Sequence, residues 1–126
     1  MKSVARPVYL NLFRIRLPLA GWVSILHRVS GALLFFALPL GVWALSVSLA
    51  NEAGFQRMAG WLTLPLSKLV LLLLVAALAQ HFFAGLRHLA LDAHWGVRLQ
   101  RARQSSFAVM LASVGVTVLA AWKLFA

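Results

Sequence analysis

A histidine lies inside a long apolar run of this chain. The run begins at Leu66, and His81 stands well within it, with further apolar residues after it. An imidazole in hydrocarbon is costly unless it is hydrogen-bonded, relays protons or binds a metal, so it is a candidate functional residue. Spacing alone leaves two roles equally open for His81. It could be an axial ligand of haem iron, or it could hydrogen-bond a hydroxyl or carbonyl group on a neighbouring helix.

A stripe of polar and small residues continues from this histidine. His81, Gly85, His88 and Asp92 are spaced i, i+4, i+7 and i+11, which puts them on one face of a helix. Gly85 has no side chain where the edge of a porphyrin would approach. The chain has no cysteine, so any metal would need histidine, methionine or oxygen ligands.

A second stripe occurs near the start of an earlier apolar run. Ser24, His27, Arg28 and Gly31 fall at i, i+3, i+4 and i+7, again on one helical face. Its cationic groups would suit the propionates of a haem or the carbonyl oxygens of a quinone, where positive charge stabilises developing negative charge. The alternative is ordinary snorkelling, in which Arg28 reaches lipid headgroups and His27 caps a carbonyl.

Three apolar segments must position these stripes, at about residues 19–49, 64–91 and 107–125. A membrane-spanning helix needs about 20 residues, and each segment is long enough. The sequence therefore predicts an all-α integral membrane protein with three transmembrane helices and a single membrane-anchor domain, residues 1–126. Antiparallel packing of the first two helices would bring the two stripes to the same side of the membrane.

The composition agrees with a membrane protein. Of 126 residues, 63% are hydrophobic and only 11% are charged, whereas a soluble domain is about one-quarter charged. The net charge of +10 could indicate nucleic-acid binding, but the basic residues flank the apolar segments instead of forming one basic face. We therefore expect no nucleic-acid partner.

The basic residues also predict an orientation. Lys2, Arg6, Arg14 and Arg16 precede the first segment, and three arginines lie in the connection at residues 92–104, against one in the connection at residues 50–63. Because positive charge gathers on the cytoplasmic side, the N-terminus and the second connection are expected inside. Arg87 shares no face with Asp92 and is expected to meet headgroups or a soluble partner. The location expected is the bacterial inner (cytoplasmic) membrane, with several passes.

These residues resemble a known family, the cytochrome b membrane-anchor subunits of bacterial succinate dehydrogenase, or respiratory complex II. Three stretches carry the resemblance, at residues 6–12 (RPVYLNL), 24–31 (SILHRVSG) and 81–92 (HFFAGLRHLALD). The resemblance extends in order and spacing over nearly the whole chain.

The resemblance implies a function and a set of partners. It implies a haem b- and ubiquinone-binding anchor of succinate:ubiquinone oxidoreductase, without a succinate site of its own. The partners would be a second membrane-anchor subunit, an iron–sulfur subunit and a flavoprotein subunit. The resemblance also implies residue roles: His81 as axial ligand of the haem iron, His27, Arg28 and His88 near the haem, and Ser24 with Arg28 at the quinone site.

Two other functions are alternatives to this one. The first is a structural anchor without cofactor, which would tether a soluble dehydrogenase through its basic surface alone. The second is a small transporter or proton channel, which needs ionisable groups across the bilayer. The two acids, Glu52 and Asp92, stand at opposite ends of the predicted spans, so the sequence disfavours a channel.

Overall fold

The computed structural model describes residues 16–126, and its regular structure there is entirely helical. The helices are α1 (Leu19–Ala50), α2 (Glu52–Thr63), α3 (Pro65–Asp92) and α4 (Leu99–Phe125). Length and apolar composition make α1, α3 and α4 able to cross a membrane. The predicted all-α architecture with three membrane-spanning helices is confirmed, and the first two predicted spans end within one residue of the observed helices.

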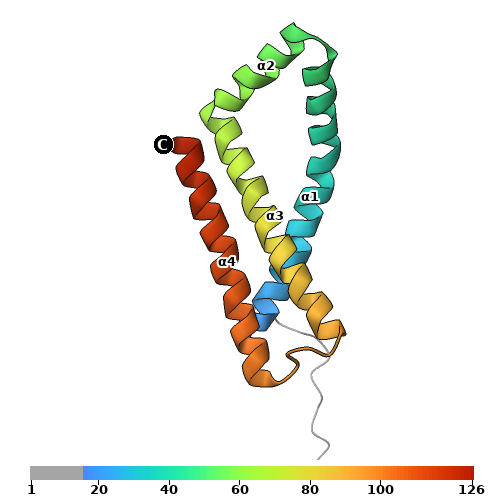
Figure 1. Cartoon of the computed structure of the whole chain (residues 1–126), viewed down its shortest axis with the longest axis vertical. Helices are drawn as coiled ribbons and strands as arrows, with labels where there is room; N and C mark the ends of the chain where they lie inside the picture. Colours follow the sequence, from blue (N-terminus) through green and yellow to red (C-terminus); the bar gives the residue numbers. More distant parts are fainter. Residues whose placement is uncertain (1–15) are drawn as a thin grey trace, which may run out of the picture.

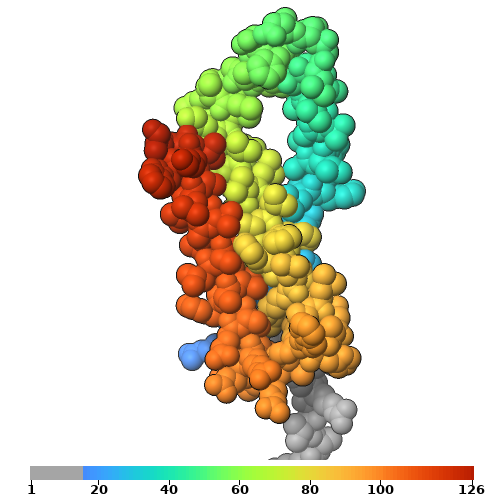
Figure 2. All heavy atoms as spheres, viewed as in Figure 1, coloured from blue at the N-terminus to red at the C-terminus, as the bar shows by residue number. Residues whose placement is uncertain are grey.

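The three long helices form an open bundle in which α3 packs against both α1 and α4. Figure 1 shows α1 and α3 running antiparallel and crossing in the lower half of the molecule, whereas α4 runs alongside α3. Beyond the crossing, α1 and α3 diverge and α2 joins their upper ends. The space-filling view shows an open gap between them there (Figure 2).

The start of α1 and the connection from α3 to α4 lie at the same end of the bundle, and α2 and the C-terminus lie at the other (Figure 1). This arrangement is the one that an odd number of antiparallel spans requires. Which end faces the cytoplasm stays a prediction. The predicted charges at residues 2, 6 and 14 lie outside the described residues, as does the stretch at residues 6–12.

The connection expected at residues 50–63 is in fact a helix, α2. The Asn51 side chain caps it, because its Oδ1 accepts a hydrogen bond from the Gly54 backbone N–H at 2.8 Å. Glu52 follows in the first turn, where a negative charge is favourable, and accepts a hydrogen bond from Gln56. Gly54 meets the end of α1 so closely that a Cβ there would collide with the Val47 carbonyl oxygen. Local capping therefore outweighs the polar, glycine-containing composition that suggested a loop.

The connection before the last helix is shorter than expected, because α4 begins at Leu99 and not near Phe107. Arg101 and Arg103 accordingly lie on the first turns of α4. The chain reverses after α3 through His94 and Gly96, which have φ values of 62° and 77°. The Trp95 N–H bonds back to the Ala90 carbonyl, as in common helix C-caps.

The packed interior is small and lies where the helices cross. Val23 from α1, Ala84 from α3 and Val109 from α4 form its centre, with Phe83 and Met110 packed against them. Many large apolar side chains elsewhere are exposed, including Phe35 at 72%. Such side chains suit lipid or another membrane helix, since contacts between membrane helices rely on close packing and not on removal from water.

The sequence suggested that Arg87 reaches outward to headgroups or a soluble partner, and the structure shows that it does not. It is buried between α3 and α4, where Nε donates to Ser105 Oγ at 3.1 Å and a terminal nitrogen donates to the Ala102 carbonyl at 3.4 Å. The long side chain crosses to the next helix because α4 starts early enough to present Ser105 and a carbonyl group opposite it. Arg87 therefore joins the two helices.

Candidate functional site

Three histidines from two helices meet close to the helix crossing. The rings of His27 and His81 stack with centroids 4.2 Å apart and an interplanar angle of 6°. The ring of His88 lies 5.0 Å from that of His27 and is tilted by 57°. All three side chains are half-buried. The two stripes recognised in the sequence do face each other, which the antiparallel arrangement of α1 and α3 makes possible.

The backbone of α1 fixes the ring of His81. Nδ1 of His81 lies 3.0 Å from the carbonyl oxygen of His27. A carbonyl oxygen can only accept, so Nδ1 is the nitrogen that carries the hydrogen. In the neutral ring the lone pair is then on Nε2, the atom available to a metal. Metal-binding histidines commonly have this arrangement, with the second ring nitrogen bonded to a backbone carbonyl.

Ser30 adds a second contact to the same nitrogen. Its hydroxyl donates to the His27 carbonyl at 2.9 Å, and its oxygen lies 3.5 Å from His81 Nδ1. Ser30 is buried between the helices. Sequence reasoning had not singled it out as a site residue. The available signal was its position, three residues after His27 on the same side of the helix.

Two glycines make room for these rings. A Cβ at Gly31 would lie 2.9 Å from His81 Cε1, closer than real Cβ contacts allow, and 3.2 Å from its Nδ1, which is tighter than most of them. A Cβ at Gly85 would lie 3.4 Å from His27 Nε2, which is ordinary van der Waals contact. Gly31 is therefore required for the observed position of His81, whereas Gly85 is less constrained. The sequence predicts a space-making role for both glycines, Gly31 for the close approach of a backbone or a flat ligand and Gly85 for the edge of a porphyrin.

Ser24 and Arg28 lie on α1 beside this cluster but are not part of it. Ser24 is half-buried, and Arg28 is exposed. They are one helical turn apart, so both side chains can reach the same small molecule on the outside of α1. Within residues 16–126, no hydrogen bond joins either side chain to the histidines. Asp92, the last residue of the α3 stripe, is exposed.

The cluster is not a complete metal site built by protein alone. Across residues 16–126, no group of three or more His, Cys, Asp or Glu side chains is arranged to hold a metal ion. A haem would need fewer ligands from the protein, because the porphyrin supplies four of the nitrogens that bind the iron. One oriented imidazole with a free lone pair meets that need.

Comparison with known proteins gives a consistent result. The family described as succinate dehydrogenase/fumarate reductase transmembrane subunits matches residues 2–121. The succinate dehydrogenase cytochrome b556 subunit of Coxiella burnetii is 33% identical over 124 residues, covering 94% of this chain and 95% of that protein. The cytochrome b556 subunit of Paracoccus denitrificans is 36% identical over 115 residues, covering 90% and 88%. That of Rickettsia conorii is 30% identical over 114 residues, covering 90% and 89%.

Proposed function

Because the chain belongs to the family of succinate dehydrogenase/fumarate reductase transmembrane subunits, we propose that it binds haem b and quinone in the membrane. Its relatives are membrane subunits of an enzyme whose chemistry on succinate takes place elsewhere in the complex, so the chain is a non-catalytic subunit of succinate dehydrogenase. Bacterial relatives and three candidate spans fit a multi-pass inner-membrane protein. The rest of the proposal assigns the haem and the quinone to particular residues of this chain.

The orientation of His81 is the observation that carries the haem proposal. Its Nδ1–H is held by the His27 carbonyl, which leaves Nε2 as a fixed ligand atom. The hydrogen bond was the alternative role for His81. It uses Nδ1 and leaves the lone pair of Nε2 for a metal. His81 would hold the iron from this side, and a residue of the second anchor subunit would hold it from the other. When bound, the haem would supply a one-electron carrier inside the bilayer.

Polar and basic side chains near His81 suit the acidic edge of such a group. His27 stacks on the His81 ring, His88 lies beside His27, and Arg28 stands on the neighbouring surface of α1. A porphyrin carries two carboxylates, which need positive charge or hydrogen-bond donors when they lie at the membrane boundary. We assign His27, Arg28 and His88 to that role.

Ser24 and Arg28 would form this chain's part of the quinone site. The Arg28 guanidinium and the Ser24 hydroxyl can both donate hydrogen bonds to a quinone carbonyl oxygen. Such donors stabilise the negative charge that develops on that oxygen during reduction. The electrons would come from the iron–sulfur subunit, which in turn is served by the flavoprotein subunit. Ubiquinone is the substrate that the family resemblance implies.

The haem proposal is tested by the optical spectrum of the purified complex. The wild-type complex should show a low-spin b-type Soret band, and His81→Leu should lose or alter that band while the subunits still co-purify. His94→Leu is the matched control, because His94 is exposed in the turn after α3. A colourless wild-type complex would instead favour a cofactor-free structural anchor. An unchanged spectrum in His81→Leu would remove this residue from the ligand role.

The quinone proposal has a separate test. Arg28→Leu should reduce succinate:quinone activity by roughly tenfold or more, because one charged hydrogen bond to the substrate is lost. Succinate oxidation with a soluble artificial acceptor should be unchanged. Arg57→Leu, which removes an exposed arginine on α2, should affect neither activity. Equal loss of both activities in Arg28→Leu would indicate failed assembly and would contradict a local role.

A further inference from the structure

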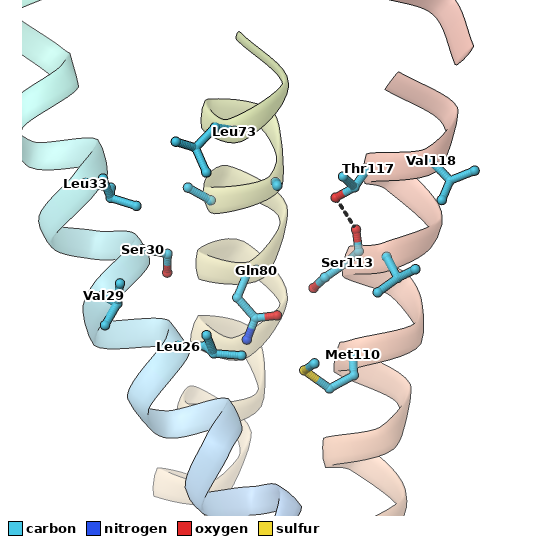
Figure 3. A pocket seen from close by; sticks show the side chains of 13 residues that line it. Leu26, Val29, Ser30, Leu33, Leu73, Gln80, Met110, Ser113, Thr117 and Val118 are labelled. Atoms are coloured by element: carbon cyan, nitrogen blue, oxygen red, sulfur yellow. Dashed lines mark hydrogen bonds between the residues drawn. The ribbon is translucent and has the colours of Figure 1, made fainter. Parts of the chain in front are cut away.

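A cavity separate from the Ser24 and Arg28 surface lies between α1, α3 and α4. Its volume is about 480 Å³, within the range of small-molecule sites. Apolar side chains form most of its wall, including Leu26 and Leu33 from α1, Leu73 from α3 and Met110 from α4. Four polar side chains interrupt the wall: Ser30, Gln80, Ser113 and Thr117 (Figure 3).

Gln80 is the residue in this cavity that lacks a partner. It is 8% exposed, and its Nε2 makes no hydrogen bond within the described part of the chain. Figure 3 shows its amide extending from α3 into the space between Leu26 and Met110. A buried amide without a partner costs about 1–3 kcal/mol, and the cost is greater in hydrocarbon, where no water is available. The amide is therefore placed to donate to something that enters the cavity.

The hydroxyl groups nearby already donate hydrogen bonds to backbone carbonyl groups. Ser30 donates to the His27 carbonyl, Ser113 to the Val109 carbonyl and Thr117 to the Ser113 carbonyl. Gln80 is thus left as the side chain with a free donor among those that line the cavity. A matching ligand must bring an acceptor, and the apolar walls require the rest of it to be hydrocarbon.

The position of Gln80 along α3 restricts the ligand further. Gln80 is in the middle third of the 28-residue helix, which is about 42 Å long. Because the hydrocarbon core is only about 30 Å thick, this part of α3 lies inside it. The ester groups of phospholipids lie at the edge of that core. The acceptor must therefore belong to a neutral molecule whose polar group can leave the headgroup region.

We propose that this cavity binds a neutral hydrocarbon-chain lipid through a carbonyl oxygen that accepts a hydrogen bond from Gln80 Nε2. A quinone has this chemistry, and so does a simple fatty acyl ester. The inference rests on the proposed function only where the ligand is quinone, and the cavity shares none of its lining with Ser24 or Arg28. Ser30 lines the cavity and also contacts His81, so a ligand there would adjoin the histidine cluster.

The test uses the infrared carbonyl band of a labelled probe. Decylubiquinone and methyl oleate, each with ¹³C at its carbonyl carbons, are added separately to the purified complex in nanodiscs. The complex carries Arg28→Leu, so that the outer quinone site does not contribute. A carbonyl that accepts a hydrogen bond from Gln80 should give a band at lower wavenumber than the free probe.

Three variants decide the outcome. Gln80→Met keeps the side-chain volume and removes the donor, so it should lose the shifted band and weaken probe binding by roughly tenfold. Ala76→Phe fills the cavity while Gln80 keeps its donor, and it should also lose the band. Gln104→Met, at an exposed glutamine on α4, should keep it. Subunit co-purification and the haem spectrum show that each variant has assembled.

The results separate the two ligand sources and the two proposals. A Gln80-dependent band with either probe supports the site and identifies which chemistry it prefers. A shifted band that persists in Gln80→Met, or the absence of any shifted band with both probes, overturns the proposal. Neither of those results bears on the proposed function, because that depends on the His81 spectrum and on the activity of the complex with Arg28 intact.

Discussion

At the scale of single residues, the hydrogen bond that His81 makes is compatible with the ligand role proposed for the same side chain. The sequence presented them as alternatives, because spacing gives a position and not the environment of each ring nitrogen. The structure places Nδ1 on the His27 carbonyl and leaves Nε2 free. The residues that arrange this, Ser30 and Gly31, were present in a recognised stretch of the sequence. Both contact His81, which lies 51 and 50 residues further along the chain, so the sequence alone could not show which side chain they would meet.

Gly31 provides a residue-scale prediction. Gly31→Ala should displace the His81 ring, since the added Cβ would lie 2.9 Å from Cε1. We expect a shifted or weakened Soret band in the assembled complex. Gly41→Ala, on the same helix with nothing within 4 Å of the added Cβ, should leave the band unchanged and may be compared directly. If both variants had the spectrum of the wild type, the position of the His81 ring would not depend on Gly31.

At the scale of helices, apolar length predicted α1 and α3 well and the start of α4 poorly. The first turns of α4 hold Arg101, Arg103 and Gln104, whose polarity resembles that of a loop. A helix may extend beyond the hydrocarbon core with such residues, because its backbone hydrogen bonds are satisfied internally whatever the solvent. Apolar length also could not predict α2, because the stretch is polar and its Asn51 cap is a weak signal there.

The buried Arg87 gives the prediction for helix packing. Arg87→Met should loosen α3 from α4, because it removes charged hydrogen bonds to Ser105 and to the Ala102 carbonyl. The loss should be about 1–3 kcal/mol, seen as a lower temperature of subunit dissociation in detergent. Arg103→Met removes an exposed arginine on α4 and should have little effect. Equal destabilisation by the two variants would argue against a specific role for Arg87 in joining the helices.

At the scale of the whole molecule, the orientation in the membrane is the prediction that remains open. The chain has no cysteine, so single cysteines can be introduced without background. With the N-terminus in the cytoplasm, Ala53→Cys at the start of α2 should react with an impermeant maleimide in intact cells. Ala93→Cys, after α3, should react only once the cells are permeabilised. The reverse pattern would invert the topology and place the histidine end on the outer side.

The same orientation decides whether the site can work as proposed. His27 is near the start of α1, and His81 and His88 are in the second half of α3. The cluster therefore lies towards the end of the bundle that holds the start of α1 and the α3–α4 connection, an end that Figure 1 shows. A soluble iron–sulfur subunit in the cytoplasm would have to approach that end. The exposed apolar surfaces of the long helices leave ample area for a second membrane subunit.

The most direct test of the haem assignment is an experimental map of the assembled complex. The account predicts haem density between this chain and the second anchor subunit, with His81 Nε2 coordinated to the iron and Nδ1 still bonded to the His27 carbonyl. A His81 ring that faces acyl chains, or an iron held by other residues while His81 stays uncoordinated, would contradict it.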